Sequence, residues 1–219
     1  MENQTYQLLI IGANGGIGRQ CVELALNAGH RVTALVRNPA NLRLIHRNLE
    51  VIQGDLLQPG TLEKYLVGKD AVVSAIGVKG GMFGDKPTTL YSEGNANLLQ
   101  AMENTGIKRA FFISASAIEI SPVIPRFVQF LAKYVIQKLL KHMYADLHRM
   151  EIVIKASDAR WTIIRPPQLS DQPATGHYRT AINDWLKDCL KISRADVAHF
   201  IIHNINNPAI IKTTVEIAY

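Results

Sequence analysis

Three glycines near the start of the chain have the spacing of a phosphate-binding turn. Gly12, Gly15 and Gly18 are separated by two residues each, and they follow an apolar stretch, residues 8–11, that predicts a β-strand. Glycines at these places allow a tight strand-to-helix turn, close approach of backbone N–H groups to a diphosphate, and close packing of the helix on the sheet. The positive N-terminal end of that helix favours an anion. The motif therefore predicts a dinucleotide site.

The end of the second predicted strand indicates which dinucleotide binds. Residues 31–36 form that strand, and Arg37 follows where NAD sites usually carry Asp or Glu for the ribose 2′-hydroxyl. A guanidinium suits a 2′-phosphate, and one charge-assisted contact of about 1.5 to 3 kcal/mol favours NADPH over NADH about ten-fold to one-hundred-fold. The alternative is that Arg37 only caps a strand end in solvent. Arg43 and Arg47 either share the phosphate or lie in water.

Strands and helices alternate along the chain, which is typical of a doubly wound parallel sheet. Further strands are predicted at residues 49–52, 71–76, 110–113, 161–164 and 213–218, with helices ending near 28–29 and covering 88–104 and 197–205. We expect a single α/β domain of the Rossmann type over residues 1–219, with a substrate-side region formed by about 119–150 and 166–192. Ligands of such sheets bind outside the carboxyl ends of the strands, so these ends should converge on the cofactor.

Residues after the third and fourth strands are candidates for contacts with the adenosine half of the cofactor. Asp55 either accepts a hydrogen bond from the adenine amino group or only shapes a turn after the preceding glycine, and Leu56 follows it in the predicted contact set. Ala75, Ile76 and Gly77 are small enough for the ribose to lie against the backbone. These residues extend the predicted cofactor site from the glycine motif to the next strand ends.

Composition limits the partners and the cellular setting. The formal net charge of +6 and the pI of about 9.4 suit a phosphorylated cofactor, but no lysine-rich run with interleaved aromatics predicts nucleic-acid binding. Cys21 and Cys189 are too few and too far apart for a disulfide framework or a zinc site, so no metal is expected. The polar N-terminus has no cleavable apolar core, and no stretch is apolar enough to span a bilayer, so we expect a cytoplasmic location.

A longer string resembles a known family. Residues 166–178 read Pro-Pro-x-x-x-Asp-Gln-Pro-x-Thr-Gly-x-Tyr. With the glycine motif and Arg37, this string resembles the atypical short-chain dehydrogenase/reductases, in particular the biliverdin reductase B (flavin reductase)-like and NmrA-like NAD(P)H-binding proteins, over nearly the whole chain. The resemblance implies an NADPH-dependent reductase of flavins or linear tetrapyrroles. It implies that Pro167, Gln168 and Leu169 lie beside the nicotinamide. The phosphate contacts that it implies are Gly12, Asn14, Gly15, Gly16, Ile17 and Arg37.

Many short-chain reductases use a Tyr-x-x-x-Lys pair, in which the tyrosine protonates a carbonyl oxygen and the lysine lowers its pKa. Tyr134 and Lys138 match this spacing. Counting back from the strand at 161–164, however, puts the superfamily's two positions near Met143 and Leu147, nearly three helical turns later. We therefore interpret Tyr134 and Lys138 as ordinary helix residues, and the two expected positions carry side chains without acid chemistry.

The remaining catalytic candidates are two serines and a second tyrosine. Ser114 and Ser116 either anchor the carboxamide or the substrate or only end the fifth strand, and the resemblance places the family's active-site serine at or next to Ala115. Tyr144 and His148 have the four-residue spacing and lie closer in register, but such a pair is also typical of surface neighbours on a helix. An enzyme without a general acid would favour acceptors such as oxidised flavin, for which orientation is the main task.

Two segments are candidates for the substrate side. Apolar residues recur at three and four along residues 121–156, with basic residues on other faces. The basic helix around 126–149 is either a pocket lid, a contact for a protein partner or an anionic membrane surface, or an ordinary helix with a solvated face. Residues 176–179 predict an irregular loop whose aromatic ring and cation either meet a flat acceptor or are merely exposed. Ser193, with Asp196 three residues later, predicts a helix start.

These residues support two functions of different classes. The first is an NADPH-dependent oxidoreductase that transfers hydride to a small planar acceptor, such as a flavin, a quinone or a linear tetrapyrrole. The second is a non-catalytic redox sensor that binds NADP(H) and acts through a protein partner, which the unfilled tyrosine and lysine positions support. A sugar-nucleotide epimerase ranks third, because that chemistry generally requires the missing tyrosine.

Overall fold

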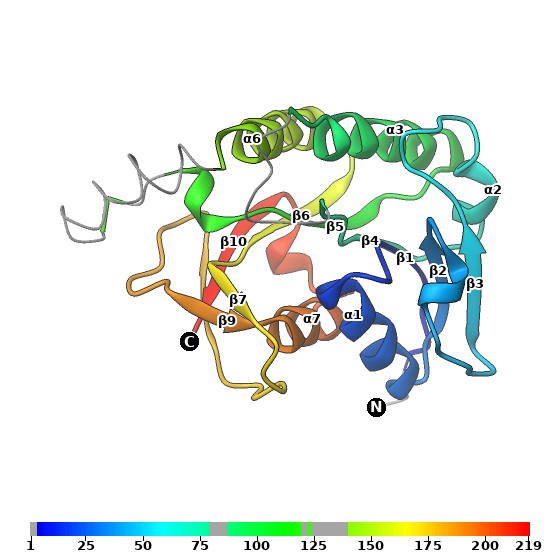
Figure 1. Ribbon diagram of the computed structural model, residues 1–219, viewed down its shortest axis with the longest axis horizontal. Helices are drawn as coiled ribbons and strands as arrows, with labels where there is room; N and C mark the ends of the chain where they lie inside the picture. Colours follow the sequence, from blue (N-terminus) through cyan, green and yellow to red (C-terminus); the bar gives the residue numbers. More distant parts are fainter. Residues whose placement is uncertain (1–3, 79–86, 120–121, 124–139) are drawn as a thin grey trace.

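A mostly parallel sheet forms the core of this protein. The computed structural model describes residues 4–78, 87–119, 122–123 and 140–219, and within them eight strands pair in the order β3-β2-β1-β4-β5-β6-β10-β8 (Figure 1). Only β8 runs antiparallel to its neighbour, so the predicted α/β doubly wound architecture is confirmed. The strands are β1 (Gln7–Ile11), β2 (Arg31–Val36), β3 (Leu49–Gln53), β4 (Ala71–Ser74), β5 (Arg109–Ile113), β6 (Arg160–Arg165), β8 (Arg179–Ile182) and β10 (Thr213–Ala218).

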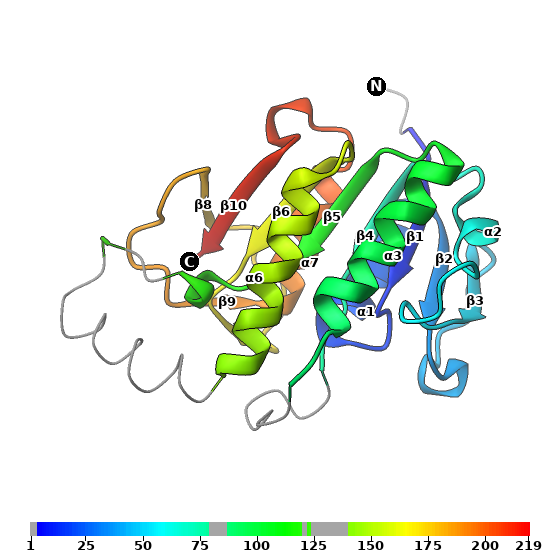
Figure 2. The ribbon, with the colours of Figure 1, turned by 90° about the horizontal axis from the view of Figure 1, so that it is seen from above.

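Helices cover both faces of the sheet. On one face α1 packs beside α7, and on the other α3 packs beside α6, as Figures 1 and 2 show. The helices are α1 (Gly16–Asn27), the short α2 (Glu63–Leu66), α3 (Leu90–Thr105), α6 (Lys141–Ala156) and α7 (Arg194–His203). None of the helices in the described ranges is long and apolar enough to cross a membrane.

The central strand β1 supplies side chains to both helix layers. Leu8 and Ile10 lie in the apolar cluster on the α1 and α7 side, whereas Leu9 and Ile11 lie in the cluster on the α3 and α6 side. All four are almost completely buried, which explains why the sequence of this strand is a continuous apolar run rather than an alternating one. Because β2 and β4 pair with opposite edges of β1, the strand order reverses here and a crevice opens at the carboxyl ends.

Several predicted boundaries are confirmed and others are corrected. The strand at 213–218 agrees with β10, and the Ser193 hydroxyl caps α7 by accepting the N–H of Asp196 at 2.8 Å. The fourth strand ends at Ser74 rather than at residue 76. The N–H of Ala75 still donates to the carbonyl oxygen of Ile11 at 3.0 Å, but Ala75 and Ile76 then pass over the glycine turn. Arg179 belongs to β8 rather than to a loop, because it pairs with Ala218.

The sequence did not predict two three-residue strands. β7 (Gln168–Ser170) and β9 (Lys191–Ser193) form a separate parallel pair beside the main sheet. Segments this short carry too little alternation to be recognised from sequence. Tyr134, Lys138 and most of the segment preceding residue 140 lie outside the described residues, so the structure describes the predicted basic helix only from residue 140 onward.

Candidate functional site

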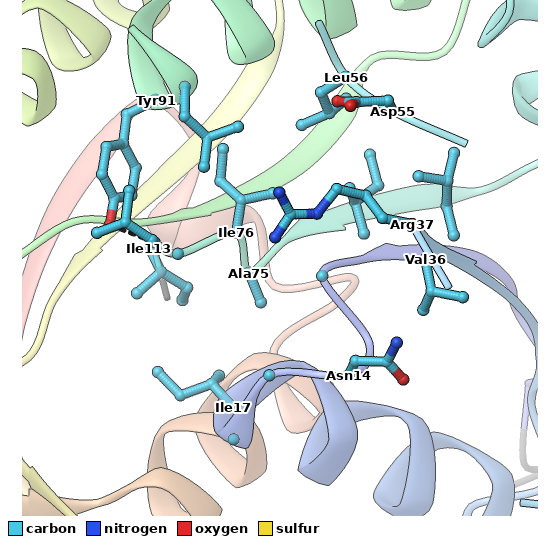
Figure 3. Close-up of a pocket in the computed structure, with 18 of the residues that line it drawn as sticks. Asn14, Ile17, Val36, Arg37, Asp55, Leu56, Ala75, Ile76, Tyr91 and Ile113 are labelled. Atoms are coloured by element: carbon cyan, nitrogen blue, oxygen red, sulfur yellow. Dashed lines mark hydrogen bonds between the residues drawn. The ribbon is translucent and has the colours of Figure 1, made fainter. Parts of the chain in front are cut away.

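A cavity of about 670 Å³ lies where the strand order reverses, at the carboxyl ends of β1 and β4 (Figure 3). Its size is typical of a site for a small molecule or cofactor. The loops after five strands and the first turn of α1 form its walls. The predicted cofactor contacts that line it are Gly12, Asn14, Gly15, Gly16, Ile17, Arg37, Asp55, Leu56, Ala75, Ile76, Gly77 and Leu169. Twelve of the fourteen predicted cofactor contacts therefore lie in this wall.

The glycine turn leaves no room for side chains. Gly12 has φ +78°, and a Cβ there would lie 2.4 Å from the carbonyl oxygen of Ala75. A Cβ on Gly18 would lie 2.3 Å from the carbonyl oxygen of Gly12. Gly15 precedes α1, and no side chain of the described residues caps this helix. Helix geometry also gives the first backbone amides no intrahelical acceptor. This cradle of amides at a positive helix end fits a dinucleotide diphosphate.

Arg37 lies at the opposite end of the cavity from the apolar wall described below. It is exposed, and Figure 3 shows its guanidinium extending across the cavity toward Ile76. Within the described ranges no carboxylate lies at ion-pair distance from it. The adjoining loop is fixed to the glycine turn, because Asn14 donates from Nδ2 to the carbonyl oxygen of Asn38 at 3.0 Å. Arg37 is therefore placed to receive an anion from the cavity.

Asp55 has a structural task as well as a place in the cavity wall. Its Oδ1 accepts the N–H of Leu57 at 3.0 Å, which forms the turn that the preceding glycine suggested. Both Asp55 and the buried Leu56 line the cavity. The other carboxylate oxygen has no hydrogen bond to any described residue, so a contact with adenine is compatible with the turn and stays a prediction.

The wall contributed by α6 is apolar. Met143 and Leu147, which lie at the two positions where the sequence resemblance would place a tyrosine and a lysine, both line the cavity. Tyr144 instead packs against the apolar cluster of α3 and α6, and burial raises the pKa of its hydroxyl. His148 is exposed, and neither it nor Tyr144 is among the described residues of the wall. This end of the cavity therefore receives no acid from α6.

A buried ionic network lies behind the wall at the end of β5. The Ser114 hydroxyl donates to Oε1 of Glu151 at 2.7 Å, and Arg165 donates to both oxygens of Glu151 at 2.9 and 2.7 Å. Arg165 also contacts Glu119, and Lys155 contacts Glu151. Burial raises the pKa of Glu151, but the hydrogen bonds and charge of Arg165 more than offset this and lower the pKa overall. Because the Glu151 carboxylate accepts the Ser114 proton, the serine hydroxyl is left to act as an acceptor, and Ser114 is one of the residues that line the cavity.

Besides Tyr144, three predicted site residues lie apart from the cavity wall in the described structure. Ser116 hydrogen-bonds the thiol of Cys189, whose pKa burial and the charge of Glu216 raise to about 12. Pro167 and Gln168 precede Leu169 in the sequence. Leu169 is among the described wall residues, whereas Pro167 and Gln168 are not. In the described ranges no group of three or more His, Cys, Asp and Glu side chains is arranged to hold a metal ion.

Tyr91, at the start of α3, is a wall residue that the sequence analysis missed. Its hydroxyl accepts the N–H of Val78 at 3.3 Å and lies 4.0 Å from where a Cβ on Gly77 would be. Burial is the main cause that raises the pKa of this hydroxyl, so it stays protonated. No described residue accepts that proton, which can therefore be donated to a bound ligand. In the sequence Tyr91 is only one more apolar position of a helix.

The predicted loop at residues 176–179 does not contribute to the described wall. The Tyr178 hydroxyl shares a hydrogen bond of 2.8 Å with Nδ1 of His199. Arg179 donates to the backbone carbonyl oxygen of Tyr219 at 2.6 Å. Both side chains therefore have partners within the fold, and contacts between them and a planar acceptor stay a prediction.

The fold and the glycine cradle together define a Rossmann-type dinucleotide-binding protein. A family model described as NAD(P)H-binding matches residues 12–208, and the chain belongs to this family. This confirms the NAD(P)H-binding family and the Rossmann-type fold, whereas the atypical short-chain dehydrogenase/reductase subtype that the sequence resemblance implied stays a prediction.

Individual proteins of known sequence or structure are similar over almost the whole chain. The uncharacterised sugar epimerase YhfK of Bacillus subtilis is 29% identical over 205 residues, which cover 91% of this chain and 88% of that protein. A short-chain dehydrogenase/reductase (wide type) from Veillonella parvula in complex with NADP has a TM-score of 0.77 at 19% identity, covering 99% and 95% of the two chains. ChuY, an anaerobilin reductase from Escherichia coli O157:H7, has a TM-score of 0.74 at 22% identity, covering 96% of each chain. These structures share the fold.

Proposed function

We propose that this protein is an NADPH-dependent oxidoreductase that transfers hydride to a flat, conjugated acceptor of the flavin, quinone or linear-tetrapyrrole type. The observation that carries the proposal is the shared cavity, which has the amide cradle and Arg37 at one end and the apolar side chains of Met143 and Leu147 at the other. An apolar wall suits a flat acceptor that needs orientation more than protonation. The fold of an anaerobilin reductase supports the tetrapyrrole class among these acceptors.

The chain's own residues bind and orient in this proposal. The amides of the first turn of α1 hold the diphosphate, and Arg37 holds the 2′-phosphate. Leu169 and Met143 exclude water from the apolar end of the cavity. When bound, NADPH supplies the hydride, and the protein supplies position and electrostatics.

Two polar groups complete the apolar end of the cavity. Ser114 accepts a hydrogen bond from a bound amide, because Glu151 holds its proton. Tyr91 donates its hydroxyl proton as a hydrogen bond to negative charge on the acceptor. We retain Ser114 as the catalytic candidate of the three predicted from the sequence, because neither Ser116 nor Tyr144 is among the described wall residues.

Replacing Arg37 with alanine should remove the preference for NADPH. We expect the Kd for NADPH to rise about ten-fold to one-hundred-fold, because one charge-assisted contact is lost, while the Kd for NADH changes less than about two-fold. Titration calorimetry with both cofactors measures this difference. Arg47→Ala is the matched control, because this substitution removes the same charge. Arg47 is also exposed, and it is not a described wall residue. Equal losses for both cofactors in Arg37→Ala would contradict the assignment.

The proposed activity is tested by mixing the protein with NADPH and each of FMN, riboflavin, a quinone and biliverdin. Oxidation of the cofactor is followed by the loss of its reduced-nicotinamide absorbance, with NADH run in parallel. Turnover with NADPH and one acceptor class supports the proposal. Its absence with every acceptor, in a protein that binds NADPH, contradicts it.

The same apolar wall favours a second candidate, a non-catalytic NADP(H) sensor that acts through a protein partner. Met143 and Leu147 provide no acid for carbonyl chemistry, and a sensor requires none. Equal affinity for NADP⁺ and NADPH, with no turnover, would support the sensor. The wall disfavours an epimerase, despite the name of the Bacillus subtilis relative, because sugar-nucleotide chemistry generally calls for a tyrosine at the Met143 position.

A further inference from the structure

Arg194 lies across the first turn of α1 at the edge of the cavity. It is the first residue of α7, and it lines the same cavity as the glycine cradle. A Cβ on Gly16 would lie 2.3 Å from Cδ of Arg194 and 2.8 Å from its Nε. The arginine stem therefore lies directly on the helix turn whose amides face the cavity, and a side chain at Gly16 would require Arg194 to move from this position.

Asp171 orients this guanidinium from the loop that follows β7. Its Oδ1 accepts from Nη1 of Arg194 at 2.7 Å, and the side chains are 87% and 31% exposed respectively. An ion pair this exposed contributes little to folding stability. Among the residues that the structure describes, only one nitrogen of this guanidinium has a partner, and the others remain able to donate to a second anion. The role of this ion pair is therefore to orient Arg194 rather than to stabilise the fold.

The loop that carries Asp171 is fastened to the same helix. Oδ1 of Asp196 accepts the N–H groups of Thr175 and Gly176, each at 2.8 Å. Asp196 also receives the hydroxyl of Ser193, the residue that caps α7. The Asp-x-x-x-Thr-Gly part of the sequence string at 166–178 therefore joins the loop to α7 at two places, one of which is the Arg194 pair.

We propose that Arg194, oriented by Asp171 across the start of α1, binds the diphosphate of the dinucleotide. A diphosphate held by the α1 amides presents negative oxygens beside the remaining guanidinium donors, and charge-assisted hydrogen bonds of this kind are strong. Arg37 then selects the 2′-phosphate, whereas Arg194 holds the part that NADP(H) and NAD(H) have in common. This inference rests on the proposed use of the cavity for NADPH.

Binding measurements on Arg194→Met and Arg37→Ala separate these two contacts. We expect Arg194→Met to raise the Kd for NADPH and for NADH by the same factor, about ten-fold to one-hundred-fold. Arg37→Ala should affect NADPH alone. Adenosine 2′-monophosphate, which has no diphosphate, should bind Arg194→Met as well as it binds the unaltered protein but should bind Arg37→Ala more weakly. Arg194→Lys, which keeps the charge but loses the planar fork, should restore part of the affinity.

The control variant is Lys191→Met, which removes one exposed positive charge from the same region without touching the cavity wall. Thermal unfolding shows that each variant is folded. Unchanged Kd values for both dinucleotides in folded Arg194→Met would overturn the inference, as would an equal loss in Lys191→Met. Failure of the unaltered protein to bind either dinucleotide would overturn the inference and the proposed function together. Binding without turnover would contradict only the proposed function.

Discussion

Gly12→Ala is expected to lower the free energy of unfolding by about 2 to 5 kcal/mol and to abolish measurable dinucleotide binding. The left-handed conformation at φ +78° costs a residue with a Cβ about 1 to 2 kcal/mol. The added Cβ would also meet the backbone oxygen of Ala75 at 2.4 Å, and relieving such a clash typically costs about 1 to 3 kcal/mol more. Because β1 and β4 must separate to relieve it, the amide cradle should lose its shape. Urea unfolding and calorimetric titration with NADPH measure the two effects.

Gly29→Ala is the matched control for this prediction. Gly29 has φ +82°, close to that of Gly12, but nothing lies within 4 Å of a Cβ built there. The free energy of unfolding of Gly29→Ala should therefore fall only by the conformational cost of about 1 to 2 kcal/mol. The variant should keep its affinity for NADPH. Similar losses of stability in the two variants, or full binding by Gly12→Ala, would show that close backbone approach at Ala75 is not required.

Glu151→Ala is expected to lower the free energy of unfolding by about 3 to 5 kcal/mol, because it leaves a buried guanidinium without its main partner. The side chains of Glu151 and Arg165 are only 3% and 6% exposed, and the remaining partner of Arg165, Glu119, is half exposed. Removing an exposed pair should cost much less. Glu23→Ala, which breaks the exposed contact with Arg19, should lose about 0.5 kcal/mol or less. Comparable losses in the two variants would contradict the importance of the network.

The same network predicts a pH dependence of stability. The pKa of Glu151 in the folded protein lies below its unfolded value, because Arg165 outweighs the effect of burial. A carboxylate of this kind stabilises the fold above its unfolded pKa of about 4.3, and this stability is lost as the pH falls through the folded pKa. Glu151→Gln should therefore show a smaller loss of stability between neutral and acid pH than the unaltered protein. Parallel profiles would contradict the assignment.

Local sequence patterns predicted the parts of the site that depend on neighbouring residues. A few consecutive residues were enough to predict each of three features: the glycine turn, the residues after β2 to β4 and the cap at Ser193. Met143 and Leu147 were located by counting along one helix, and both line the cavity. These features depend on backbone geometry and helical spacing, which a single sequence expresses directly.

Features that depend on tertiary pairing could not be predicted in the same way. Arg194 reaches the glycine turn only because α7 packs on α1, and its own sequence context shows no more than a helix start. Glu151 and Arg165 lie on different elements, and nothing near either residue indicates the pairing with Ser114. Tyr91 occupies a position that an amphipathic helix would fill with any apolar residue. Such contacts follow from the packing of distant segments.

The most direct test of the proposed hydride transfer is single-turnover oxidation of NADPH, unlabelled or deuterated at nicotinamide C4, with the acceptor that supports turnover. We predict that deuteration at one face of C4 slows the reaction severalfold, and that deuteration at the other face does not, because the cavity holds the ring in one orientation. We also predict that NADH reacts about ten-fold to one-hundred-fold less efficiently at limiting concentration. Tight NADPH binding with no oxidation by any acceptor, or oxidation that is insensitive to deuteration at both faces, would contradict the account.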